Sequence, residues 1–178
     1  MTAQEVIDKY YPPGTPRRVI YLSHCKAVAG LAMEIAERKN LPLEADDVWS
    51  AAMLHDIGIF LTDAPSIGCT GTEPYIRHGI LGAELLRREG MPESWARVAE
   101  RHTGAGITIE DIDIQSLPLP RRDYVPETLL ERLVCYADKF YSKSGDMKRK
   151  SIDRVIASME RISQATLDRF MQLHDEFR

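Results

Sequence analysis

The sequence of 178 residues has little of what marks a secreted or membrane protein. Its three cysteines, Cys25, Cys69 and Cys135, lie far apart and form no CxxC pair, which argues against a disulfide framework and a cysteine zinc site. The first twenty residues contain no apolar signal segment, and no apolar stretch approaches the roughly 20 residues that span a bilayer. These absences predict a cytoplasmic protein with reduced thiols and no membrane partner.

A large excess of charge of one sign is also absent. The 23 Lys and Arg residues against 27 Asp and Glu give a net charge of -4, and the basic residues form only short clusters such as Lys148 to Lys150. This balance gives no reason to expect a nucleic-acid partner. A hydrophobic content of 44% at this length suits one domain, residues 1–178, with a substantial core.

Strand signals are nearly absent, while helical periodicity dominates, so we predict an all-α, single-domain helical bundle. The predicted helices cover about residues 3–10, 16–39, 44–57, 74–89, 92–103, 127–143 and 151–176. We expect the third helix to end at Gly58, and we interpret segments 59–72 and 104–126 as loops. The helix over 151–176 has an apolar stripe that predicts packing on the bundle and leaves a homodimer open.

Histidine is scarce as well, and its placement is informative. Four of the five histidines, together with two aspartates, lie on apolar faces of the predicted helices: His24, His55, Asp56, His78, His102 and Asp138. A carboxylate on a core-facing stripe is rare unless it is paired or binds a metal. A single inward histidine is more often an ordinary core residue, but six such groups would each need an unrelated partner.

The six groups therefore predict a metal site with nitrogen and oxygen ligands. Such ligands favour iron or manganese and leave nickel, zinc or magnesium open, with magnesium disfavoured by four imidazoles. His55 and Asp56 are adjacent, so they differ by about 100° around a helix and can reach one centre only near a helix end.

Five segments around these residues, in the order H…HD…H…H…D, resemble the HD-domain superfamily of metal-dependent phosphohydrolases. The likeness is to the subgroup with an HDIG doublet and two extra histidines, and it covers a motif-bearing core of about residues 17–143. The spacing is similar to that of bacterial HD hydrolases of diadenosine tetraphosphate and of an archaeal-type HDIG group. The matching segments are 22–24, 54–58, 77–79, 101–104 and 136–139.

The resemblance implies a binuclear phosphohydrolase with two divalent transition-metal ions and a small phosphorylated substrate, a nucleotide by preference. One ion would be held by His24, His55, Asp56 and Asp138. The second would be held by His78 and His102, with Asp56 bridging, so Asp56 is the residue on which catalysis most depends. Candidates for contacts with the substrate phosphate, each of which could equally be a surface charge, are Arg77, Arg101, Arg122 and Lys139.

The chain departs from the family pattern after the doublet. Many HD hydrolases carry a Lys or Arg there, whereas Ile59, Phe60 and Leu61 follow in this chain. Two alternatives stay open: an HD-type di-iron oxygenase with the same ligand order, and a non-catalytic regulatory module stabilised by metal. The complete ligand series weighs against the second alternative.

Overall fold

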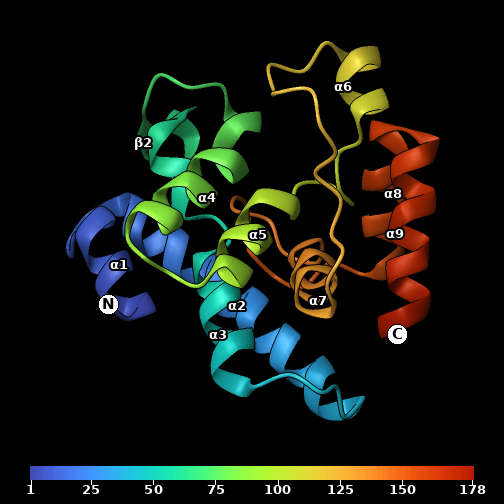
Figure 1. Ribbon diagram of the computed structural model, residues 1–178, viewed down its shortest axis with the longest axis horizontal. Helices are drawn as coiled ribbons and strands as arrows, with labels where there is room; N and C mark the ends of the chain where they lie inside the picture. Colours follow the sequence, from blue (N-terminus) through green and yellow to red (C-terminus); the bar gives the residue numbers. More distant parts are fainter.

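The computed structural model describes residues 1–178, and its regular secondary structure is almost entirely helical, as Figure 1 shows. The α-helices are α1 (Ala3–Tyr10), α2 (Pro16–Arg38), α3 (Ala45–Leu54), α4 (His78–Arg88), α5 (Glu93–Arg101), α6 (Ile109–Gln115), α7 (Leu129–Asp138), α8 (Ile152–Ile162) and α9 (Gln164–Phe177). Three short 3-10 helices are η1 (Ile57–Leu61), η2 (Pro65–Ile67) and η3 (Tyr75–Arg77). The only sheet pairs β1 (Asp63–Ala64) with β2 (Cys69–Thr70) in antiparallel fashion. The all-α prediction is confirmed.

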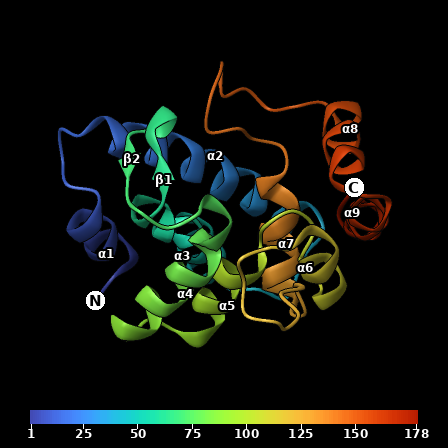
Figure 2. The same cartoon turned by 90° about the horizontal axis from the view of Figure 1, so that it is seen from above.

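The core is one cluster of 36 buried hydrophobic residues to which every α-helix except α6 contributes. Helix α2 packs on α3 and α7, and α4 packs on both α5 and η1. Helices α8 and α9 pack on each other, and α9 contacts α7; Figure 2 shows the pair at one side of the bundle. The C-terminal helices therefore share a core with the helices that carry the predicted ligands.

We predicted no apolar stretch long enough to span a bilayer, and helix α2 differs from this prediction. An 18-residue window of this helix has a mean hydropathy of 1.3, so by length and composition alone α2 could cross a membrane. The central helix of a packed bundle passes the same test, because most of its faces are covered by other helices. In the structure, His24, Cys25 and Val28 of α2 are buried in the interior of the bundle.

The end of the third helix was predicted incorrectly. Helix α3 ends at Leu54, and Gly58 lies inside η1 instead of terminating α3. A Cβ atom at Gly58 would lie 2.3 Å from the carbonyl oxygen of His78 and 2.4 Å from the backbone nitrogen of Gly82. Gly58 is therefore required because η1 presses against the backbone of α4, and this contact brings the His55-Asp56 turn next to His78.

Four other predicted segments also differ from the structure. Segment 59–72 contains the small hairpin, and segment 104–126 contains α6, whose N-terminus is closed by a capping box between Thr108 and Asp111. The predicted helix over 127–143 already ends at Asp138. The predicted helix over 151–176 is two helices, because Ser163 is extended and its side chain caps the start of α9.

Candidate metal centre

The six polar residues predicted as ligands meet at one buried place in the bundle. His24 lies in the middle of α2, whereas the other five lie at helix ends: His55 and Asp56 directly follow α3, His78 begins α4, His102 directly follows α5 and Asp138 ends α7. None has more than 7% of its surface exposed. Side chains at helix ends can converge more closely than the 8–10 Å that separates packed helix axes.

The ligand atoms form two clusters that share Asp56, and each cluster could hold a metal ion. In the first cluster, Asp56 Oδ2 lies 3.3 Å from His24 Nε2 and 3.2 Å from His55 Nε2. Asp138 Oδ1 completes this cluster at 2.9 Å from His24 Nε2 and 3.3 Å from His55 Nε2.

The second cluster faces the other oxygen of the same carboxylate. Asp56 Oδ1 lies 3.4 Å from His78 Nε2 and 3.2 Å from His102 Nε2. The two carboxylate oxygens of Asp56 therefore point to different sets of imidazoles. Oδ1 has no hydrogen-bond partner, Oδ2 forms an ion pair with Lys143 Nζ at 2.8 Å, and both oxygens are fully buried.

Three of the imidazoles are oriented by the same backbone contact. The Nδ1 atoms of His55, His78 and His102 lie 2.6 Å, 2.7 Å and 2.8 Å from the carbonyl oxygens of Ala52, Tyr75 and Ala99, each three residues earlier. A carbonyl oxygen can only accept, so each Nδ1 carries the proton that it donates. This hydrogen bond directs each Nε2 atom into the site, as in histidines that bind metals.

The second cluster contains a repulsive contact that a cation would relieve. The Nε2 atoms of His78 and His102 are 3.1 Å apart. Because Nδ1 of each ring donates to a carbonyl, two neutral rings direct Nε2 lone pairs at one another. A divalent cation between these atoms and Asp56 Oδ1 would satisfy all three acceptors, so the donor set fits a bound metal.

Electrostatics hold these groups in the forms that metals need. Burial lowers the pKa of His78 to about 3 and also lowers the pKa of His102, although Asp56 opposes both shifts. Burial acts in the opposite direction on Asp56, but His55 and Lys143 outweigh it and hold the pKa of Asp56 well below its ordinary value. The second cluster therefore combines neutral imidazoles with an ionised carboxylate.

The first cluster differs, since His55 retains a proton there. Burial would lower the pKa of His55, but the nearby Asp56 outweighs it and raises this pKa well above its ordinary value. For Asp138, burial would raise the pKa, but Lys139 and the hydrogen bond to His24 hold it well below its ordinary value. A metal ion in this cluster would replace the proton on His55.

Comparison with known proteins identifies the family. Residues 21–142 match the model of the HD domain, a segment that contains all six residues of the two clusters. The chain belongs to the HD domain family. Its fold is also similar to the crystal structure of the HD domain of the phosphodiesterase PgpH from L. monocytogenes, with a TM-score of 0.57 and 17% identity over 96% of this chain and 85% of that one.

Sequence relatives of this HD domain protein have mixed names. An uncharacterized protein of Methanocaldococcus jannaschii is 37% identical over 161 residues, covering 87% of this chain and 86% of the relative. Proteins named tRNA (cytidine(56)-2'-O)-methyltransferase are 36% identical in Picrophilus torridus and 33% identical in Thermoplasma volcanium, over 75% and 96% of this chain. The chain spans only 35% and 45% of the length of those two proteins.

A lysine that sequence reasoning missed lies at the centre of this HD domain. Lys143 Nζ is 2.8 Å from Asp56 Oδ2, and Asp56 raises the pKa of Lys143 above its ordinary value despite burial. Many HD hydrolases carry a basic residue after the doublet, whereas here the positive charge comes from the segment that follows α7. The available signal was a lysine five residues beyond Asp138, just past the end of a ligand-bearing helix.

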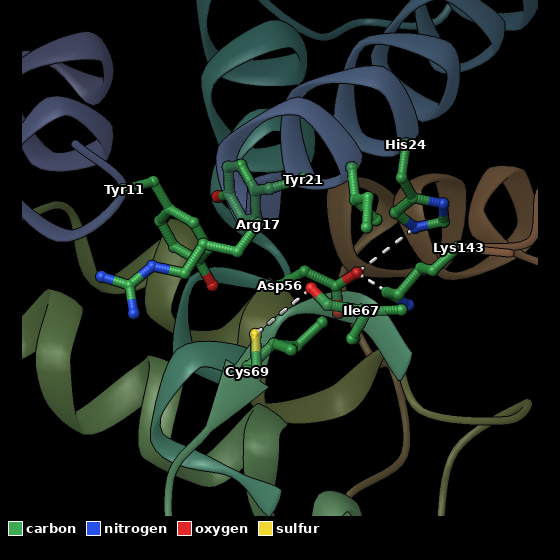
Figure 3. Close-up of a pocket in the computed structure, with 10 residues that line it drawn as sticks. Tyr11, Arg17, Tyr21, His24, Asp56, Ile67, Cys69 and Lys143 are labelled. Atoms are coloured by element: carbon green, nitrogen blue, oxygen red, sulfur yellow. Dashed lines mark hydrogen bonds and ion pairs between the residues drawn. The ribbon is translucent and has the colours of Figure 1, made fainter. Parts of the chain in front are cut away.

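Lys143 also closes the space beside the first cluster. Figure 3 shows a cavity lined by Tyr11, Arg17, Tyr21, His24, Asp56 and Lys143, among others, in which His24 and Lys143 both reach Asp56. Its volume is about 10 Å³, which is room for about one water molecule. The cavity beside Asp56 therefore has no room for a larger molecule while the Lys143 side chain lies there.

The four residues predicted to contact substrate differ in their surroundings. Lys139 is buried, and its Nζ donates to Asp138 Oδ2 at 2.6 Å and to the carbonyl oxygen of His102 at 2.9 Å. The three arginines pair with carboxylates outside the clusters: Arg77 with Glu73 at 2.8 Å, Arg101 with Glu127 at 2.8 Å and Arg122 with Glu100 at 2.7 Å. The structure thus brings Lys139 to the site and gives the arginines other partners.

Proposed function

We propose that this HD domain protein is a binuclear metal-dependent phosphohydrolase that acts on a small phosphate ester, with a nucleotide as the favoured substrate. The observation that carries this proposal is the division of Asp56 between two clusters, Oδ2 facing His24 and His55 and Oδ1 facing His78 and His102. One buried carboxylate whose two oxygens face different sets of imidazoles is suited to bridge two ions. We infer that Asp56 holds both ions in place.

His24, His55, Asp56 and Asp138 would hold the first ion, and Asp56, His78 and His102 would hold the second. Imidazole and carboxylate ligands in this ratio favour iron or manganese. When bound, two divalent ions polarise phosphoryl oxygens and generate a nucleophile from water at neutral pH.

The residues of the chain itself have three roles in this proposal. The carbonyl oxygens of Ala52, Tyr75 and Ala99 fix the imidazole rings, so ligand geometry is set before substrate arrives. Lys139 holds Asp138 through its 2.6 Å contact with Oδ2. Lys143 is the cation nearest to Asp56, and on turning away it would offset charge on the phosphate during P–O bond cleavage.

Metal analysis combined with a substitution tests the proposal. We expect wild-type protein to bind about two transition-metal ions per chain and to release phosphate from a panel of nucleotides and generic phosphate esters without oxygen. Asp56→Asn keeps the side-chain shape and removes the charge, so both metal content and turnover should fall, turnover by at least about 100-fold. The matched control is Asp113→Asn, an exposed carboxylate paired only with Arg121, which should change neither.

Each contrary result has a distinct meaning. Bound iron with no hydrolysis in the absence of oxygen would contradict the hydrolase and favour the oxygenase chemistry. A wild-type protein that binds no metal would contradict the site itself. Metal that persists in Asp56→Asn would contradict the bridging role of Asp56 while leaving the clusters intact.

A further inference from the structure

A second cavity, rich in positive charge, lies beyond the metal centre between the segment after α7 and helix α8. Its volume is about 680 Å³, and nine of its ten lining residues are polar, charged or glycine. Its basic residues are Lys148, Lys150, Arg154 and Arg161. Figure 2 shows this segment rising above the bundle between α7 and α8 before the chain enters α8.

The positive charges around this cavity are not neutralised by the protein. Nine of the 23 Lys and Arg residues have no carboxylate within 4.0 Å, and the four basic residues of the cavity are among those nine. The one carboxylate on the wall, Asp146, accepts a hydrogen bond from the backbone N–H of Lys148 at 3.1 Å. In a chain with an overall net charge of -4, four unpaired cations at one cavity create a local site for an anion.

One cation of the cavity is also partly desolvated. Lys150 is half-buried, and burial together with nearby cations lowers its pKa below its ordinary value. Its Nζ reaches only the carbonyl oxygen of Lys139, at 3.4 Å. An anion in the cavity would supply the counter-charge that Lys150 lacks.

The segment that lines this cavity also reaches the metal centre. Ser142 and Ser144 line it, and Lys143 between them extends to within 2.8 Å of Asp56 Oδ2. Neighbouring Cα atoms are 3.8 Å apart and an extended lysine reaches roughly 6 Å, so with the 2.8 Å contact the backbone of this wall lies within about 13 Å of Asp56 Oδ2. Linked phosphates that begin at the metal centre and the long basic side chains of the cavity can together cover that distance.

We propose that this cavity binds the additional phosphates of a substrate whose reacting phosphate lies at the metal centre. The substrate class is therefore an oligophosphate, in which two or more phosphates are linked, as in a nucleoside triphosphate. The proposal that the substrate is an oligophosphate rests on the proposed function. The proposal that the cavity binds an anion does not rest on it, and anion binding can be tested without metal or turnover.

Calorimetric titration of inorganic tripolyphosphate into the full chain in excess EDTA tests the anion site. Lys148→Ala/Arg154→Ala removes two exposed cations of the cavity, and the affinity should fall on the order of tenfold or more. The matched control is Lys9→Ala/Arg88→Ala, which removes two exposed charges next to Glu89, at α1 and the end of α4. Its affinity should change less than about twofold. Lys148→Arg should retain binding because it keeps the charge.

Equal loss in the control variant, or no loss in Lys148→Ala/Arg154→Ala, would overturn the anion site. A variant that still binds tripolyphosphate but loses a single-stranded RNA oligonucleotide would also overturn it, in favour of RNA. With active protein, Lys148→Ala/Arg154→Ala should raise KM for nucleoside triphosphates and leave KM for monophosphates unchanged. Tripolyphosphate binding without any hydrolysis would support the anion site while refuting the phosphohydrolase, so the two failures are distinguishable.

Discussion

The contact between Lys143 and Asp56 makes a quantitative prediction for Lys143→Met, which keeps the side-chain length and removes the charge. The ion pair measures 2.8 Å, the Asp56 side chain is fully buried and the Lys143 side chain is 19% exposed. Removing one partner of a buried ion pair costs about 3–5 kcal/mol, because the other charge stays buried without compensation. We take the lower figure, about 3 kcal/mol. Asp56 raises the pKa of His55, so a protonated His55 would still offset part of the charge on Asp56.

This cost applies only to the metal-free protein. Two divalent ions beside Asp56 would replace the ammonium group as counter-charge, so in the loaded protein the substitution should cost below about 1 kcal/mol. In a domain of this size 1 kcal/mol corresponds to roughly 2–4 °C in Tm. We therefore expect Lys143→Met to lower Tm by about 6–12 °C in EDTA and by only about 2–4 °C or less with excess manganese.

Differential scanning calorimetry of the two proteins in EDTA and in manganese measures this difference. The control is Lys26→Met, an exposed lysine of α2 with no carboxylate partner, which should leave Tm nearly unchanged in both buffers. A loss of Tm that is the same with and without metal would refute the reasoning, because it would mean that Lys143 stabilises the fold independently of the charge on Asp56.

Two further predictions concern packing and pH. Gly58→Ala should destabilise the protein by several kcal/mol in urea unfolding, because its Cβ would meet the α4 backbone at 2.3 Å, whereas Gly30→Ala, with nothing within 4 Å, should stabilise by about 0.5–1 kcal/mol. A Gly58→Ala protein as stable as wild type would contradict the close contact between η1 and α4. Burial would raise the pKa of Glu131, but Arg97, 2.6 Å away, lowers it below the ordinary 4.5. The stability from this pair is therefore present above about pH 4.5 and is lost as the pH falls below it, so Glu131→Gln should flatten the acid limb of a stability–pH curve. If Glu131→Gln had the same acid limb as wild type, the ionisation of Glu131 would not be what lowers stability at acid pH.

The sequence predicted elements well where one short-range signal acts alone. Thr15 and Pro16 marked the start of α2, and its end was placed within a residue, because proline at the first turn and periodic apolar residues depend only on local chain geometry. The ends of α3 and α7 were placed too late. Apolar residues continue past Leu54 and Asp138, so periodicity alone does not record that the chain turns there to aim polar side chains into the core.

One glycine and one serine also show that local sequence signals do not record contacts between distant segments or every helix break. Gly58 was interpreted as a helix terminator, which is the common local role of glycine, but its actual role is close contact with a helix some twenty residues away. Ser163 divides the C-terminal helix in two, and the preference of serine for helix N-termini could have signalled this break.

The sequence by itself determined the helical class and the six residues that meet in the core, because imidazoles and carboxylates on apolar faces are costly unless they converge. The family resemblance implied that Asp56 bridges, but only the tertiary structure decided which of its oxygens faces which imidazoles, and that Lys143 rather than a residue after the doublet brings positive charge there. The same holds for the cations that line the cavity at α8. The physical reason is that charge interactions depend on distances in space, and residues 56 and 143 become neighbours only when the helices pack.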